Sequence, residues 1–207
     1  MRFPFPRLYA IIDAAQLGDR APEEATERLL RAGVRLLQYR AKLATSRQLF
    51  EAALRMAAQV ARAGGVLVVN DRADVALAAR ARGVHLGQQD LPVEMARRIL
   101  GDDFIIGCST HSLDQAEEAD RSPADYVALG PIFATESKAQ PDSVVGLDGL
   151  REARRATRKP LVAIGGITLE NALEVIAAGA DSVAVIHDLL AAPDLEIRAR
   201  QFLQLLM

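Results

Sequence analysis

The stretch LVVNDRADVALAARARGVHLGQQD, residues 67–90, predicts a strand, a helix and a second strand in close succession. The first strand is an apolar run over 66–69, and Asp71 lies just beyond its end. An alanine-rich helical segment leads to a short strand over 83–86, and Asp90 follows that strand. Parallel strands joined by helices release their loops at one edge of the sheet, where ligands bind. Both carboxylates are therefore expected on a ligand-binding rim.

Asp71 and Asp90 follow neighbouring strands, so their side chains are expected to converge. Two carboxylates beside amide donors suit a hard cation such as Mg²⁺, which keeps water ligands and bridges to phosphate oxygens. A second interpretation is equally open from this stretch. Asp71 could cap the helix that follows it, and Asp90 could lie in a solvated turn.

Composition limits the classes of protein that this chain can be. Its 207 residues, half hydrophobic and a quarter charged, predict one globular domain over 1–207. The formal net charge of -2 argues against a nucleic-acid or anionic-membrane surface. A lone cysteine, Cys108, excludes an intrachain disulfide. The N-terminus lacks the pattern of a signal peptide, and no run approaches the ~18 apolar residues of a membrane span. We expect a cytoplasmic protein.

The number of alternating elements predicts the fold. Strands are predicted at 8–12, 36–39, 66–69, 83–86, 104–106, 126–129, 161–164 and 182–186. Helices are predicted at 22–32, 45–62, 73–81, 92–100, 115–119, 147–156, 170–178 and from about 195 onward. Eight such units predict an α/β protein with a compact (β/α)₈ TIM barrel. A doubly wound open sheet is the alternative, but no GxGxxG follows the first strand.

The end of the second predicted strand is cationic. Gln38, Arg40 and Lys42 should face the same side, because successive strand residues point in opposite directions. A guanidinium and an ammonium group there suit a phosphate or pyrophosphate. The alternative is a solvated basic loop.

Hydroxyls and an imidazole follow the fifth predicted strand in the sequence GCSTH, residues 107–111. They could bind a ligand or move a proton. Alternatively, Ser109 or Thr110 could cap the next helix. We expect His111 at the surface because no partner carboxylate is evident in the sequence, and Cys108 in the core.

Two further loops have the composition of anion-binding sites. Residues 130–138, GPIFATESK, combine spaced hydroxyls with a lysine. Gly165-Gly166 follows the seventh predicted strand and exposes backbone N–H groups, and His187-Asp188 follows the eighth. Loops at these two places form the common phosphate site of such barrels. The alternative for the glycine pair is a tight turn.

Seven segments in order along the chain resemble the thiamine phosphate synthase family. They are QYRAK at 38–42, VNDRADVALA at 69–78, GVHLGQQDLP at 83–92, GCSTHSLDQAEEA at 107–119, DYVALGPIFATESK at 125–138, VAIGGIT at 162–168 and GADSVAVI at 179–186. The resemblance implies the same barrel and a transferase. Its two small-molecule substrates would be hydroxymethylpyrimidine pyrophosphate and a thiazole phosphate, and its products thiamine phosphate and pyrophosphate. No nucleic-acid or membrane partner is implied, and barrels of this size often form homo-oligomers.

The resemblance also implies roles for individual residues. Asp71 and Asp90 would ligate magnesium, which would assist the leaving pyrophosphate. Arg40, Ser109 and Lys138 would act in catalysis. The implied substrate-binding positions are Gln38, Tyr39, Arg40, Ala41, Lys42, Asn70, Ser109, Thr135, Glu136, Ser137, Lys138, Gly166, Ile186 and His187.

The chain departs from the family pattern in two places. His187 stands where a serine is usual, which would narrow the thiazole phosphate pocket or add a donor to it. Ala139 and Gln140 stand after Lys138 where a lysine and an aspartate are usual. One positive charge and one carboxylate are thereby missing from that loop.

Two rival functions stay open. A thiazole tautomerase of the same superfamily would use an imidazole, and His111 occupies a position where that branch also carries histidine. Asn70, Asp71, Asp90 and Lys138 together favour the synthase, because a tautomerase transfers no pyrophosphate-activated group. The other rival is a non-catalytic barrel that binds a thiamine precursor.

Overall fold

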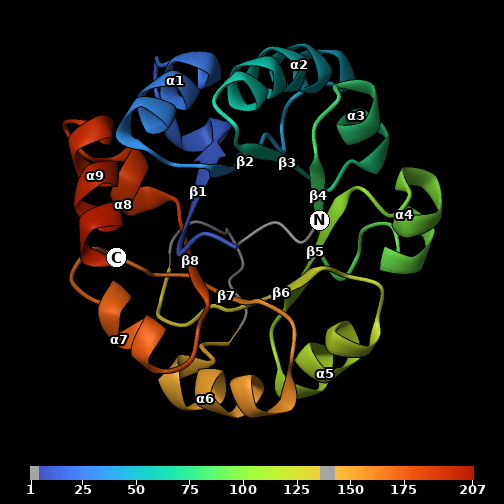
Figure 1. Ribbon diagram of the computed structural model, residues 1–207, viewed down its shortest axis with the longest axis vertical. Helices are drawn as coiled ribbons and strands as arrows, with labels where there is room; N and C mark the ends of the chain where they lie inside the picture. The colour runs from blue at the N-terminus through green and yellow to red at the C-terminus, as the bar shows by residue number, and fades with distance from the viewer. Residues whose placement is uncertain (1–4, 136–142) are drawn as a thin grey trace.

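Eight parallel strands close into a barrel, in chain order, and β8 pairs back onto β1 (Figure 1). The structure is a computed structural model that describes residues 5–135 and 143–207. The strands are β1 (Leu8–Asp13), β2 (Leu36–Arg40), β3 (Val66–Asn70), β4 (Gly83–Leu86), β5 (Ile105–Thr110), β6 (Tyr126–Leu129), β7 (Leu161–Ile164) and β8 (Ser182–Val185). The predicted TIM barrel is confirmed, and the open sheet is excluded.

Helices form a ring around this barrel (Figure 1). They are α1 (Pro22–Ala32), α2 (Ser46–Arg62), α3 (Ala73–Ala78), α4 (Val93–Leu100), α5 (Leu113–Arg121), α6 (Gly146–Ala156), α7 (Ala172–Ala177), α8 (His187–Leu190) and α9 (Leu195–Leu205). A short 3-10 turn, η1 (Ala14–Gln16), follows β1. Within residues 5–135 and 143–207, no helix has the length and apolar character to cross a membrane.

Local sequence explains where α2 begins and which face it buries. Thr45 caps it: its hydroxyl accepts from the Gln48 N–H at 3.3 Å, and the Gln48 side chain bonds back to the Thr45 N–H. Met56 and Val60 are buried on its inner face, whereas Leu54 is 40% exposed. It lies two residues from Met56, which places it on the opposite side of a helix with 3.6 residues per turn.

The largest departures from the predicted elements lie in β5, in α3 and after β8. β5 continues past Gly107 to Thr110, pairing with β6 along its length. α3 ends at Ala78 rather than 81, and Arg80 takes a left-handed φ of 55°. Beyond β8 the predicted turn is a short helix, α8.

Strand residues alternate between two apolar cores. In β1, Leu8, Ala10 and Ile12 pack outward against the helices, while Tyr9 and Ile11 belong to a cluster inside the barrel. Several members of that inner cluster, Tyr9 and Ile11 among them, also line a cavity inside the barrel.

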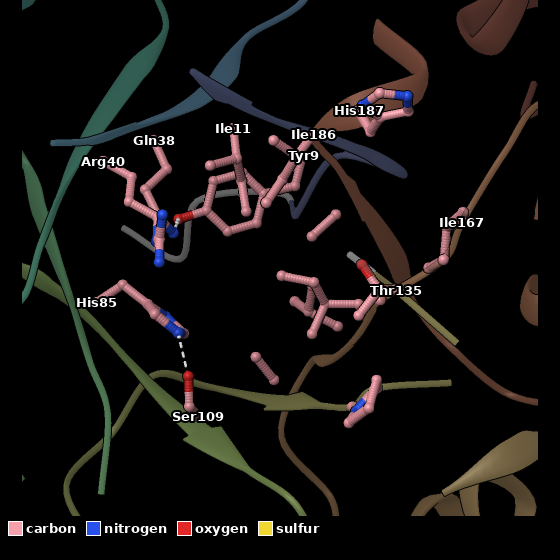
Figure 2. A pocket seen from close by; sticks show the side chains of 18 of the residues that line it. Tyr9, Ile11, Gln38, Arg40, His85, Ser109, Thr135, Ile167, Ile186 and His187 are labelled. Carbon is pink, nitrogen blue, oxygen red and sulfur yellow. Dashed lines mark hydrogen bonds between the residues drawn. The ribbon is translucent and has the colours of Figure 1, made fainter. Parts of the chain in front are cut away.

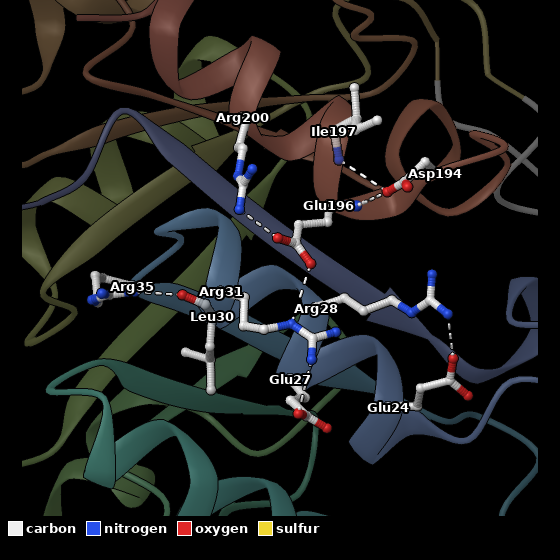
Figure 3. Close-up of polar contacts among 10 residues, drawn as sticks. All are labelled: Glu24, Glu27, Arg28, Leu30, Arg31, Arg35, Asp194, Glu196, Ile197 and Arg200. Carbon is white, nitrogen blue, oxygen red and sulfur yellow. Dashed lines mark hydrogen bonds and ion pairs between the residues drawn. The ribbon is translucent and has the colours of Figure 1, made fainter.

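The first and last helices pack together where the barrel closes. Figure 3 shows Glu196 of α9 between Arg200 and Arg31, and Arg31 lies 3.1 Å from Glu27. These side chains are largely exposed, so each pair contributes roughly 1 kcal/mol or less. Buried apolar side chains, Leu29 of α1 and Phe202 of α9 among them, hold the contact.

Phe202→Ala is expected to lower the free energy of unfolding by about 3–5 kcal/mol, because it removes a fully buried ring and leaves a cavity. Ile197→Ala on the same helix is the matched control, since Ile197 is 55% exposed and should change stability by about 0.5 kcal/mol or less. Urea unfolding measures both. Equal losses would contradict the assignment of Phe202 to the core.

Candidate active site

A cavity of about 720 Å³ opens at the C-terminal ends of the strands. All eight strands or the loops after them line it. Its residues include Tyr9, Ile11, Gln38, Arg40, Asn70, His85, Ser109, Thr110, His111, Gly130, Thr135, Ile164, Gly165, Gly166, Ile186 and His187. This volume lies in the ordinary range for small-molecule sites.

Gln38 and Arg40 of β2 both line the cavity, as strand alternation predicts. The Gln38 amide donates to the Tyr9 hydroxyl at 2.8 Å. Arg40 donates to the carboxylate of Asp13, which is buried at the end of β1. The buried carboxylate fixes the guanidinium at the cavity wall, where it can meet an anion.

Tyr39 and Ala41 do not follow the substrate-binding prediction. Tyr39 is buried in the outer core between the barrel and the helices. Ala41 packs partly buried against the same core. Successive strand residues point to opposite faces, so the alternation that directs Gln38 and Arg40 inward turns their neighbours outward.

Asp71 and Asp90 come together, as predicted from their places after neighbouring strands. Burial, reinforced by the adjacent Asp71 carboxyl, raises the pKa of Asp90. The Gly87 N–H donates to Asp90 at 2.7 Å. Lys42 lies 2.6 Å from Asp71, with its side chain half exposed. The capping alternative for Asp71 is excluded, because α3 begins with no side-chain cap.

This carboxylate pair has the donor chemistry of a magnesium site. Two close carboxylates repel each other, and a divalent cation relieves that repulsion. In the part of the chain that the structure describes, no group of three or more His, Cys, Asp or Glu could hold a metal ion. Two protein carboxylates still fit Mg²⁺, because this ion takes its other ligands from water and substrate phosphates.

Residues 109–111 all line the cavity. Ser112, not Ser109 or Thr110, caps α5. The Thr110 hydroxyl links β5 to β6, because it donates to the Ala128 carbonyl at 3.0 Å. His111 is half-buried and donates from Nδ1 to the Gly130 carbonyl at 2.6 Å. Our expectation of a surface His111 is wrong, because the extension of β5 carries the residue to the cavity rim.

His85 is a cavity residue that the sequence analysis missed. It is buried in β4, with Nε2 2.8 Å from Ser109 Oγ and Nδ1 2.9 Å from the Tyr126 hydroxyl. Figure 2 shows the His85–Ser109 contact at one side of the cavity. The alternation of β4 could have revealed it, since Val84 and Leu86 are the outward residues and His85 is therefore inward.

The loops after β6 and β7 form the opposite wall. Phe133 donates its N–H to the Gly165 carbonyl at 3.0 Å, and the Asn171 amide donates to the Gly166 carbonyl at 2.9 Å. Gly165 and Gly166 have φ of 97° and 65°, a region that favours glycine. Figure 2 shows Thr135 on this wall, across the cavity from His85.

Ile186 and His187 complete this side at the start of α8. The His187 ring is exposed and donates from Nδ1 to the Gln16 side chain at 3.3 Å. Asp188 accepts from the Leu169 N–H at 3.1 Å, which ties the loops after β7 and β8 together. The predicted residues Glu136, Ser137 and Lys138 lie outside the described residues.

Comparison with known proteins identifies relatives of high similarity. A sequence model of the thiamine monophosphate synthase family matches residues 8–189. The thiamine-phosphate synthase of Koribacter versatilis is 52% identical over 209 residues, covering 97% of this chain and 96% of that protein. That of Chloroflexus aurantiacus is 46% identical, covering 94% and 90%. The structure of thiamine phosphate pyrophosphorylase from Pyrococcus furiosus superposes with a TM-score of 0.87 at 35% identity, covering 97% and 95%.

The Gly166 turn yields a stability prediction with a matched control. Gly18→Ala meets no atom within 4 Å, so it should cost about 1–2 kcal/mol for its left-handed φ of 59° alone. Gly166→Ala would also bring a Cβ within 2.6 Å of the Ala134 carbonyl oxygen, adding ~1–3 kcal/mol. Urea unfolding of both variants measures the difference. A Gly166→Ala loss no larger than that of Gly18→Ala would refute the close approach.

Proposed function

Because the chain belongs to the thiamine monophosphate synthase family, we propose that it joins hydroxymethylpyrimidine pyrophosphate to a thiazole phosphate, forming thiamine phosphate and releasing pyrophosphate. Membership makes it a transferase acting on small molecules. The observation that carries the finer assignment is a cavity with two unlike walls. One wall has Arg40 and Asn70, and the other has the glycine turn after β7. The Asp71–Asp90 pair follows at the strand ends next to Asn70 and does not itself line the cavity.

The pyrimidine pyrophosphate would occupy the wall with Gln38, Arg40, Asn70 and Ser109. Amide and hydroxyl groups of these residues can hydrogen-bond a polar ring, and the guanidinium matches phosphate oxygens. Lys42 would leave Asp71 to reach the pyrophosphate, and Lys138 would join it there. Arg40 needs no such rearrangement, because Asp13 already fixes it at the wall.

The thiazole phosphate would occupy the opposite wall. The backbone at Gly166, Ile186 and His187 would surround its phosphate, and Thr135 and Ser137 would donate hydroxyls. Support comes from the glycine turn, which lines the cavity, and from the N–H groups at the start of α8. His187 can add an imidazole donor where a serine is usual in the family.

Asp71 and Asp90 would hold Mg²⁺, which supplies positive charge to neutralise the departing pyrophosphate. The bond between the pyrimidine methylene carbon and the pyrophosphate oxygen breaks, and its electron pair leaves with the pyrophosphate. The thiazole nitrogen, held close by the opposite wall, then forms the new bond to that carbon. No side-chain nucleophile is needed. Burial raises the pKa of Cys108, which keeps this thiol protonated.

Single-turnover formation of thiamine phosphate from the two substrates, with and without Mg²⁺, tests the proposal. Metal-dependent product is expected from the wild type. Asp71→Asn should lower the rate about 10²-fold or more, because it removes a charge that acts on the transition state. Asp74→Asn is the control, since Asp74 is exposed and pairs with Arg72. It should behave like the wild type.

The tautomerase is the second candidate, because His111 lines the cavity and can supply the imidazole that this reaction would use. A chain that forms no thiamine phosphate but isomerises the thiazole carboxylate phosphate would overturn the synthase proposal. In that case His111→Asn should abolish the isomerisation. If the synthase is correct, His111→Asn should leave the metal dependence of product formation intact.

Thermal melting without substrate tests the metal site separately. The raised pKa of Asp90 means that its charge at neutral pH opposes folding, so stability is gained as the pH falls through that pKa. Asp90→Asn carries no such charge and should melt at a higher temperature than the wild type without metal. Mg²⁺ should raise the melting temperature of the wild type but not of the variant. An equal rise of the melting temperature in both proteins would show that Asp90 is not a ligand of Mg²⁺.

A further inference from the structure

A chain of hydrogen bonds crosses the floor of the cavity through five strands and ends at Ser109. Gln38 Nε2 lies 2.8 Å from the Tyr9 hydroxyl, which lies 3.0 Å from the Tyr126 hydroxyl. The Tyr126 hydroxyl lies 2.9 Å from His85 Nδ1. His85 Nε2 lies 2.8 Å from Ser109 Oγ. Every link is within ordinary hydrogen-bond distance.

The first donor fixes the direction of the links that follow. The Gln38 amide nitrogen can only donate, so Tyr9 accepts from it and directs its own proton to Tyr126. Tyr126 then donates to His85 Nδ1, which must be unprotonated. A doubly protonated His85 would donate to Tyr126, and Tyr126 would then donate to Tyr9. The Tyr9 proton would face only the Gln38 nitrogen, which is itself a donor.

Burial keeps the Tyr9 and Tyr126 hydroxyls protonated, so both can act as hydrogen-bond donors. It raises the pKa of Tyr9 and of Tyr126 well above the ordinary value, so both hydroxyls retain their protons at any pH at which the protein works. The Tyr126 ring stacks on His85, with centroids 5.6 Å apart. A Cβ on Gly107 would lie 2.0 Å from the Tyr126 Cζ atom, so Gly107 provides the space that the ring occupies.

We infer that His85 is a positioning residue that carries its proton on Nε2, donates to Ser109, and so makes the Ser109 hydroxyl a donor toward the ligand in the cavity. Ser109 Oγ accepts from His85 and directs its proton away from the ring. The site would therefore select a ligand with a lone pair at this point, such as a ring nitrogen or a phosphate oxygen. The identity of that ligand rests on the proposed function, whereas the protonation of His85 does not.

Nitrogen NMR of the substrate-free protein tests the inference directly. With ¹⁵N-histidine labelling, the signals missing from His85→Gln identify the His85 ring among the three histidines. A protonated Nε2 and an unprotonated Nδ1 are expected. A proton on Nδ1, alone or with Nε2, would overturn the inference even if the protein makes thiamine phosphate. The expected tautomer would stand even if the proposed function fails.

Tyr126→Phe tests whether the chain sets the tautomer. It removes the donor to His85 Nδ1, so part of the His85 population should move its proton to Nδ1. Tyr39→Phe is the matched control, because Tyr39 faces the helices, and it should leave the His85 signals unchanged. An unchanged His85 in Tyr126→Phe would show that the chain does not direct its proton.

Two replacements of His85 distinguish its hydrogen bond to Ser109 from its contribution to packing. A glutamine amide can still donate to Ser109, whereas leucine cannot. With the proposed substrates, His85→Gln should retain about tenfold more kcat/KM than His85→Leu, the ratio expected for one hydrogen bond near 1.4 kcal/mol. Equal losses would mean that His85 acts through its shape alone.

Discussion

Closure of the sheet between β8 and β1 is the constraint on which the rest of the molecule depends. Leu8, Tyr9 and Ala10 pair with residues 183–185, so no strand edge is left at this seam. Closure gives every strand one inward and one outward face. It also brings the C-terminal ends of all the strands to a single rim. The outward faces bind the helices, and the inward faces near the rim carry the candidate chemistry.

Much of this arrangement could be predicted from the sequence, because strand alternation and strand exits are local properties. Alternation places Gln38 and Arg40 of β2 on the same face. The strand exits bring Asp71, which follows β3, next to Asp90, which follows β4. The glycine pair at 165–166 was also located correctly. Alternation within β4 also predicts that His85 faces the barrel interior, because Val84 and Leu86 on either side of it face the helices.

The predictions for β5, His111 and Tyr39 differ from the structure, because glycine occurs both at strand ends and within strands and tyrosine both in binding sites and in cores. Gly107 was taken as a strand end, yet it lies within β5 because the Tyr126 ring needs its space. That error shortened the strand and placed His111 at the surface. Tyr39 was assigned to substrate by its place in a motif, although its neighbours in the strand show that it must face the helices. Pairing of Lys42 with Asp71 depends on three-dimensional distance, which no sequence pattern supplies.

The contact between Gly107 and Tyr126 also has a consequence for how this barrel can diverge. The two residues lie opposite each other in adjacent strands, and only one of them can be large. A side chain at 107 would force a smaller residue at 126, and the stacking partner of His85 would be lost with it. The order of replacement is therefore constrained among descendants of this sequence: a smaller residue must take the place of Tyr126 before a larger one can take the place of Gly107.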